Sequence, residues 1–140
     1  MSLLLEPSGK PGMKLAILFG LAALGAFLIY VRVAPSDPSY WHVSVTDAAD
    51  PGWAGVKLHE VTGSLLCLND VALASGATGL AGSPEEGRVT WIVRSPILSF
   101  PDYITAEQTD AGLHILSRLR FGAYDWGVNR RRIEDWITRL

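Results

Sequence analysis

The stretch from Ser95 to Leu140, SPILSFPDYITAEQTDAGLHILSRLRFGAYDWGVNRRRIEDWITRL, predicts a β-hairpin that leads into a C-terminal helix. Two strands with alternating apolar residues, about 103–109 and 113–121, flank an Asp-Ala-Gly turn. A helix that starts after Asp125 carries four apolar residues at the spacing of one helix face: Ile133, Trp136, Ile137 and Leu140. This stripe is expected to cover one face of the hairpin.

Upstream of the hairpin, residues 88–94 and 56–61 alternate apolar and polar side chains and predict two more strands. The segment after 56–61 predicts a helix capped by Thr62 or Ser64, with three apolar residues on one face: Leu65, Leu68 and Ala72. Residues 75–87 contain four glycines and predict a flexible loop. The expected fold class is therefore α+β, a small domain of antiparallel strands packed by two helices.

Several segments of this region resemble a known family. They are FPDYITA at 100–106, LSRLRFG at 116–122 and YDWGVNRRRIEDWI at 124–137. Together they resemble the bacterial and plastid family named domain of unknown function 1499, and APSDPSYWH at 34–42 is similar to its membrane-anchored variant in alphaproteobacteria. The resemblance covers about 33–140. Many relatives carry an Asn-Cys-Val-Ser-type segment that this sequence lacks, and the resemblance implies a fold but no reaction.

Five polar residues are candidates for a shared cluster, because the end of a strand lies close to the start of the helix that follows it: Asp102, Arg118, Asp125, Asn129 and Arg130. In the structural interpretation, Asp125 accepts hydrogen bonds from the first helical turn, and Arg118 or Arg130 pairs with a carboxylate. Gly127 would let the chain turn into the helix. In the alternative interpretation, the cluster recognises a ligand or a partner.

The sequence predicts no catalytic, cofactor or metal site and no binding of nucleic acid. His42, His59 and His114 lack the spacing of a metal pair, and Cys67 is the only cysteine. No G-x-S-x-G motif marks a nucleophile. The net charge is −2, and no basic stripe is interleaved with stacking aromatic residues.

Residues 15–32 predict a transmembrane helix, since the run from Leu15 to Val31 has no charged residue. A cleaved signal peptide is the competing interpretation, but Arg32 would put a charge close to the cleavage site. Lys10 and Lys14 precede the run, so residues 1–14 are expected in the cytoplasm and the domain in the periplasm, at a bacterial inner membrane. Four small residues are candidates for packing against another membrane helix: Gly20, Ala22, Gly25 and Ala26.

A collar rich in proline and glycine, residues 33–55, is expected to join the anchor to a domain of residues 56–140. Aromatic residues near the end of the span and in the collar are expected at the lipid headgroup layer: Tyr30, Tyr40, Trp41 and Trp53.

These features favour a non-catalytic accessory subunit or interaction module of a larger inner-membrane complex, such as an energy-converting one, with membrane lipids as further partners. The alternative is an envelope-anchored module that binds a lipid or another small molecule in a sheet-lined apolar pocket with Arg118 or Arg130 at its mouth. An enzyme is the third and least supported class.

Overall fold

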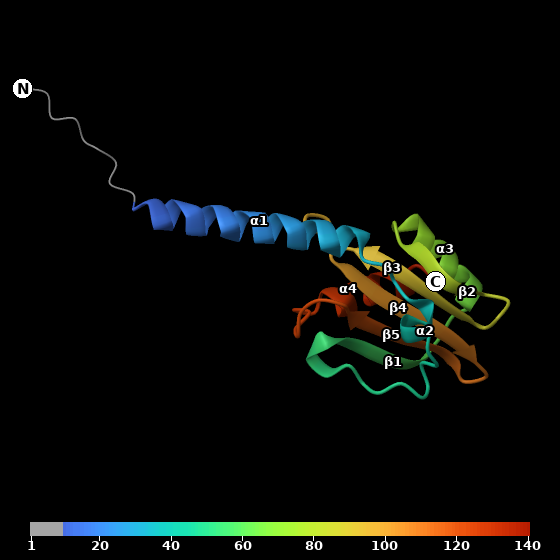
Figure 1. Ribbon diagram of the computed structural model, residues 1–140. Helices are drawn as coiled ribbons and strands as arrows, with labels where there is room; N and C mark the ends of the chain where they lie inside the picture. Colours follow the sequence, from blue (N-terminus) through green and yellow to red (C-terminus); the bar gives the residue numbers. More distant parts are fainter. Residues whose placement is uncertain (1–9) are drawn as a thin grey trace, which may run out of the picture. The chain divides into compact units, whose positions relative to one another are not determined.

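The computed structural model describes residues 10–140, so the first nine residues of the expected cytoplasmic segment lie outside it (Figure 1). The chain divides after Ala34 into two compact units. The first unit contains one helix, α1 (Pro11–Val33), which begins with a proline in its first turn. At 1.5 Å per residue its 23 residues extend about 34 Å.

Helix α1 is long and apolar enough to cross a membrane, with a mean hydropathy of 2.2 in its most apolar window, although a signal sequence has the same character. It begins four residues before the predicted span of 15–32. The extra turn contains Lys14, whose long side chain can reach the headgroup layer from the end of a span.

The second unit is built on a five-stranded antiparallel sheet with the strand order β1-β5-β4-β3-β2. The strands are β1 (Gly55–Val61), β2 (Thr78–Ser83), β3 (Arg88–Arg94), β4 (Pro101–Thr109) and β5 (Gly112–Leu119). The predicted α+β class, with antiparallel strands packed by two helices, is confirmed.

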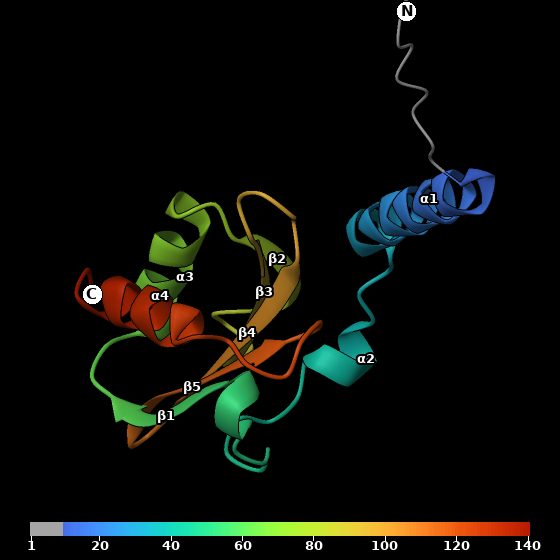
Figure 2. The same ribbon diagram turned by 90° about the vertical axis from the view of Figure 1, so that its left-hand side faces the viewer.

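Two helices, α3 (Leu65–Ala74) and α4 (Val128–Ile137), lie together on one face of the sheet, as Figures 1 and 2 both show. The core between helices and sheet is mainly apolar and includes Leu68, Trp91, Ile104, Ile133 and Trp136. The predicted stripe of α4 therefore does cover the sheet, although Leu140 at its end is 37% exposed. Ser64 caps α3 by accepting a hydrogen bond from the backbone N–H of Cys67.

The prediction of a flexible loop at 75–87 is wrong, because β2 occupies half of it. Strand β2 pairs with β3 from Thr78 opposite Ile92 to Ser83 opposite Arg88. Its sequence, TGLAGS, has no run of β-branched residues, so its local preference for a strand is weak. Backbone pairing along the edge of the sheet compensates for that weakness. Strand β5 also ends earlier than predicted, since beyond Leu119 it has no partner on β4.

The predicted collar is part of the domain rather than a linker. Its first half, with the short helix α2 (Pro38–Trp41) and the residues up to Ala48, covers the face of the sheet opposite α3 and α4 (Figure 2). The Trp41 ring stacks on that of Tyr103 with centroids 3.8 Å apart, and Val45 is fully buried. His42 Nδ1 lies 2.8 Å from Thr90 Oγ1 on β3. Burial and the nearby charge of Arg88 lower the pKa of His42.

Glu107 on β4 fixes this covering segment to the sheet. Its Oε2 accepts hydrogen bonds from the backbone N–H groups of Val45 (2.7 Å) and Thr46 (3.4 Å), and its Oε1 pairs with Arg88 Nη2 at 2.5 Å. Burial acts to raise the pKa of Glu107, but these hydrogen bonds and the Arg88 charge outweigh it and hold the pKa below its ordinary value.

Replacement of Glu107 with glutamine should lower the free energy of unfolding by about 1–3 kcal/mol at neutral pH, because the hydrogen bonds lose their charged acceptor. A carboxyl with a lowered pKa contributes stability above its ordinary pKa of about 4.3 and loses it as the pH falls through the folded-state value. The difference between the variant and the wild type should therefore shrink below about pH 4. Urea unfolding of the variant and the wild type, at neutral pH and below about pH 4, measures this difference in the free energy of unfolding. Glu134→Gln, a change at an exposed carboxylate, is the control, and equal losses in the two variants would contradict the role given to Glu107.

Candidate functional site

The candidate polar residues divide between the two faces of the sheet. On the helix-covered face, Arg132 of α4 donates from Nη1 to Asp102 Oδ2 at 3.3 Å and to Asn129 Oδ1 at 2.5 Å. Asp102 is only 8% exposed and Asn129 is fully buried. Burial raises the pKa of the Asp102 carboxyl, while the neighbouring Arg132 acts in the opposite direction. Asp102, Asn129 and Arg132 thus form a buried ionic cluster at the start of α4.

Asp125 acts as a cap for α4, as expected. Its two oxygens accept hydrogen bonds from the backbone N–H groups of Gly127 (2.8 Å) and Asn129 (3.2 Å). Gly127 has φ +72°, a left-handed conformation that suits glycine and turns the chain into the helix. These contacts give Asp125 a structural role at the helix start.

Arg118 lies on the other face of the sheet, away from the buried ionic cluster. Its Nη2 donates to the backbone carbonyl of Trp41 at 2.7 Å, and its guanidinium lies 4.9 Å from the centre of the Trp41 ring. Burial lowers the pKa of Arg118. The expectation that Arg118 or Arg130 forms the ion pair across the corner is wrong, because that partner is Arg132. Arg130 approaches only Glu134, at 3.8 Å on the exposed side of α4, where such a pair adds little stability.

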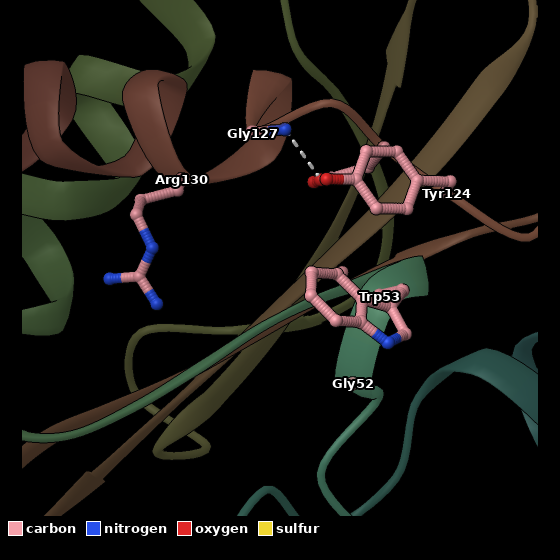
Figure 3. A pocket seen from close by; sticks show the side chains of 7 residues that line it. Gly52, Trp53, Tyr124, Gly127 and Arg130 are labelled. Carbon is pink, nitrogen blue, oxygen red and sulfur yellow. Dashed lines mark hydrogen bonds between the residues drawn. The ribbon is translucent and has the colours of Figure 1, made fainter.

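Arg130 instead borders a hollow of about 240 Å³ at the N-terminal end of α4. Figure 3 shows Arg130, Trp53 and Tyr124 around this space. Gly55 also lines it. The rings of Trp53 and Tyr124 stack with centroids 5.3 Å apart. A Cβ at Gly55 would lie within 2 Å of the backbone oxygen of Ser117, so only glycine fits there. The hollow is somewhat smaller than the usual site for a small organic ligand, about 300–1,000 Å³.

Exposed apolar side chains gather around this hollow and beside it, where β3 and β5 end and β1 and β4 begin. We name this surface the apolar rim; it consists of Trp53, Ile97, Leu98, Tyr124, Trp126 and Val128, with exposed fractions between 41% and 84%. A second hollow, lined by Phe100, Phe121, Tyr124 and Val128 among others, connects the β3–β4 loop with the β5–α4 loop. Of this set, the sequence predicted an interfacial position only for Trp53. Four of the others, Ile97, Leu98, Tyr124 and Trp126, lie in loops, where period-based patterns do not apply, and Val128 is the first residue of α4.

The aromatic residues that were expected at a membrane interface differ in their surroundings. Trp41 is half-buried, with its ring stacked on Tyr103 and close to the Arg118 guanidinium. Tyr40 and Trp53 are 66% and 74% exposed. Tyr30 is exposed on α1, three residues before its end.

The four small residues of α1 do not share one face. Ala22 and Ala26 are one turn apart with Gly25 beside them, whereas Gly20 lies about 160° around the helix from Ala22. An added Cβ at Gly20 or Gly25 would meet nothing within 4 Å. A seam for another helix can therefore use Ala22, Gly25 and Ala26 but not Gly20.

Two of the three histidines, far apart in the sequence, meet in the structure. His59 Nδ1 lies 3.1 Å from His114 Nδ1, and His114 Nε2 lies 3.0 Å from Thr109 Oγ1. Strand pairing between β1 and β5 produces this contact. Within residues 10–140, no group of three or more histidine, cysteine, aspartate or glutamate side chains is placed to hold a metal ion.

Fold and site together define a small α+β domain preceded by an apolar helix, with structural ionic contacts inside and an apolar surface at one end. The model of the family described as "Protein of unknown function (DUF1499)" matches residues 33–140. The chain belongs to this family, which confirms the resemblance drawn from its motifs. The match begins ahead of α2, in keeping with the packing of that segment on the sheet. The chain has no match among curated proteins or among solved structures.

Proposed function

We propose that this protein is a single-pass membrane protein whose domain is a non-catalytic interaction module, an accessory subunit of a larger inner-membrane complex. The observation that carries the proposal is the apolar rim. Its six large side chains stay exposed at one end of a domain whose core is otherwise well filled. An exposed apolar surface of this kind typically marks a site of association with a protein or a membrane.

Three carboxylates of the domain support the same proposal, because they are engaged in structural contacts. Asp125 caps α4, and Asp102 pairs with Arg132. Glu107 holds the segment that covers the second face of the sheet. Acids and bases committed in this way keep one protonation state and one position, whereas general acid–base catalysis needs groups that exchange protons with a substrate.

Isolation of the tagged full chain in a mild detergent, followed by a native gel, tests the proposal. We expect the chain to migrate with a larger complex. The pair of changes Ala22→Leu and Ala26→Leu, on the small-residue face of α1, should weaken this association. Gly20→Leu is the matched control on the other side of the helix and should not. Migration only as a free monomer, in detergents that keep known complexes intact, would refute the accessory role.

The proposed orientation places the domain in the periplasm and rests on Lys10 and Lys14 ahead of the apolar run. A cysteine at position 110, in the exposed β4–β5 turn, tests it in a Cys67→Ser background with a membrane-impermeant thiol reagent. Labelling in spheroplasts with an intact inner membrane agrees with the proposal. Labelling only after the membrane is opened would contradict the proposed orientation and place the domain in the cytoplasm.

A small-molecule binding module is the second candidate, favoured by the hollow in Figure 3. Arg130 and the Trp53–Tyr124 pair would offer an anionic, planar ligand one charge and one aromatic wall. For this candidate, Arg130→Ala would abolish the cellular function while leaving any larger complex intact.

A further inference from the structure

The loops that carry the apolar rim are held rigidly, although their tips are exposed. In the β3–β4 loop, Ser95 N–H donates to the Phe100 carbonyl at 2.9 Å, and Phe100 N–H donates to Ser95 Oγ at 3.0 Å. This closed loop presents Ile97, which is 84% exposed. In the β5–α4 loop, Asp125 N–H donates to the Trp53 carbonyl at 3.0 Å. Trp126 follows it and is 78% exposed.

Backbone strain accompanies both tips. Ser99 has φ +58° and Trp126 has φ +55°, left-handed values that are unfavourable for a residue other than glycine. Such conformations persist only where the surrounding contacts impose them. The fold therefore imposes a strained backbone at Trp126 and, two residues after Ile97, at Ser99, while both apolar side chains stay exposed.

The apolar rim lies at the end of the sheet where the chain enters the domain. Arg120, just after β5, donates from Nη1 to the Pro35 carbonyl at 2.9 Å. Ser36 Oγ lies 2.6 Å from the Tyr103 hydroxyl near the start of β4. Pro35 follows the last residue of α1 by two positions, which is about 7 Å of extended chain. If α1 spans a bilayer, chain length alone keeps this end of the domain next to the lipid surface.

Positive charge surrounds the rim. Arg94 ends β3, Arg120 follows β5, and Arg130 and Arg131 are exposed in the first turns of α4. Among the carboxylates at this end, Asp102 pairs with Arg132, Asp125 caps α4, and Asp50 accepts a hydrogen bond from the Gly52 N–H. An apolar centre of tryptophan, tyrosine and aliphatic side chains within an arginine border matches the interface of an anionic bilayer, where indole and phenol rings settle at headgroup depth.

We propose that the apolar rim inserts into the headgroup layer of the bilayer that holds α1, with Ile97 and Trp126 deepest and the exposed Arg130 and Arg131 on anionic headgroups. The inference rests on the membrane anchoring in the proposed function. It assigns the apolar rim to lipid, so contact with a larger complex would use the face of α1 that carries Ala22, Gly25 and Ala26. The short link between α1 and Pro35 keeps lipid at a high effective concentration beside the apolar rim, so burial of a modest apolar area is enough for docking. Docking would fix the distance and the tilt of the domain at the membrane.

The test uses the full chain in vesicles of phosphatidylcholine and phosphatidylglycerol, with Cys67→Ser to remove the exposed native thiol. An environment-sensitive fluorophore is attached at Ile97→Cys in the rim, at Asp110→Cys at the opposite end of the sheet, or at Ala22→Cys inside α1. Lipid-borne quenchers report contact with the bilayer. We expect a blue-shifted emission and strong quenching at positions 97 and 22, and neither at 110.

A second variant tests the chemistry of the surface. Trp126→Asp should reduce quenching at position 97 severalfold without changing the signal at 110, because an inserted carboxylate opposes entry into the headgroup layer. Vesicles of phosphatidylcholine alone should give weaker quenching at 97.

The outcomes separate the inference from the proposed function. Quenching at 22 without quenching at 97 would overturn lipid docking and leave the anchor intact. Loss of quenching at both positions would overturn the anchor as well. A label at 97 that is shielded in native membranes but not in lipid vesicles would show that a protein covers the rim, and this too would overturn the inference.

Discussion

Replacement of Trp136 with alanine should lower the free energy of unfolding of the domain by about 3–5 kcal/mol. Trp136 is 2% exposed and packs edge to face on Trp91, with ring centroids 6.0 Å apart. Trp91 is itself fully buried and donates from Nε1 to Asn69 Oδ1 at 3.0 Å, which ties β3 to α3. Loss of the indole would leave a cavity where α4, α3 and the sheet meet, and the rigid surroundings could close it only in part.

Urea unfolding of the full chain in detergent, followed by near-ultraviolet circular dichroism, measures this loss. Trp126→Ala is the matched control, since it removes the same side chain from a 78% exposed position and should change stability by less than about 0.5 kcal/mol. If Trp136→Ala unfolded at the same urea concentration as the wild type, α4 would not cover the sheet through this stripe.

The hairpin and α4 could be predicted from the sequence because their signals are local and periodic. Ile133, Trp136 and Ile137 recur at helical spacing, and the apolar residues of β3 and β5 alternate. Strand β2 could not be predicted in this way. Its residues have weak strand preference, and the hydrogen bonds to β3 that form it depend on an edge left open in the folded sheet.

The role of the segment around α2 could not be predicted either, because the contacts that fix it are distant in sequence. Val45 N–H reaches Glu107, and the Trp41 carbonyl reaches Arg118, across more than sixty residues each. Prolines and short polar side chains gave this segment the composition of a linker. Its side chains that pack on the sheet, the buried Val45 and the half-buried Trp41, are too few to produce a periodic pattern.

The partner of Asp102 is Arg132, two residues after Arg130, one of the two arginines predicted for an ion pair. Three consecutive arginines, 130 to 132, point in directions about 100° apart on α4. The buried stripe sets the rotation of the helix, and Arg132 lies one turn before Trp136, at the edge of that stripe. It therefore faces the sheet, while Arg130 faces solvent. Spacing relative to Trp136 was the signal that could have selected Arg132.

Removal of the Arg132 charge should lower the free energy of unfolding almost as much as removal of the Trp136 side chain. Arg132→Met keeps most of the side-chain volume but leaves the Asp102 carboxylate, 11% exposed in its side chain, without a cation. Breaking a buried pair by removing one partner costs about 3–5 kcal/mol, and we expect about 3 kcal/mol because both side chains keep a little contact with water. Arg131→Met, at an exposed position one residue earlier, is the control and should be nearly neutral.

The pH dependence of this loss identifies its cause. Burial raises the pKa of Asp102, and without Arg132 nothing equivalent opposes that rise. An acid with a raised folded-state pKa destabilises the fold above that pKa, and the penalty disappears as the pH falls below its ordinary value of about 4. The stability gap between Arg132→Met and the wild type should therefore narrow from neutral pH toward about pH 4. The double variant with Asp102→Asn should recover most of the loss at neutral pH. A gap that stayed constant with pH and survived in the double variant would mean that Arg132 stabilises α4 by packing rather than by its charge.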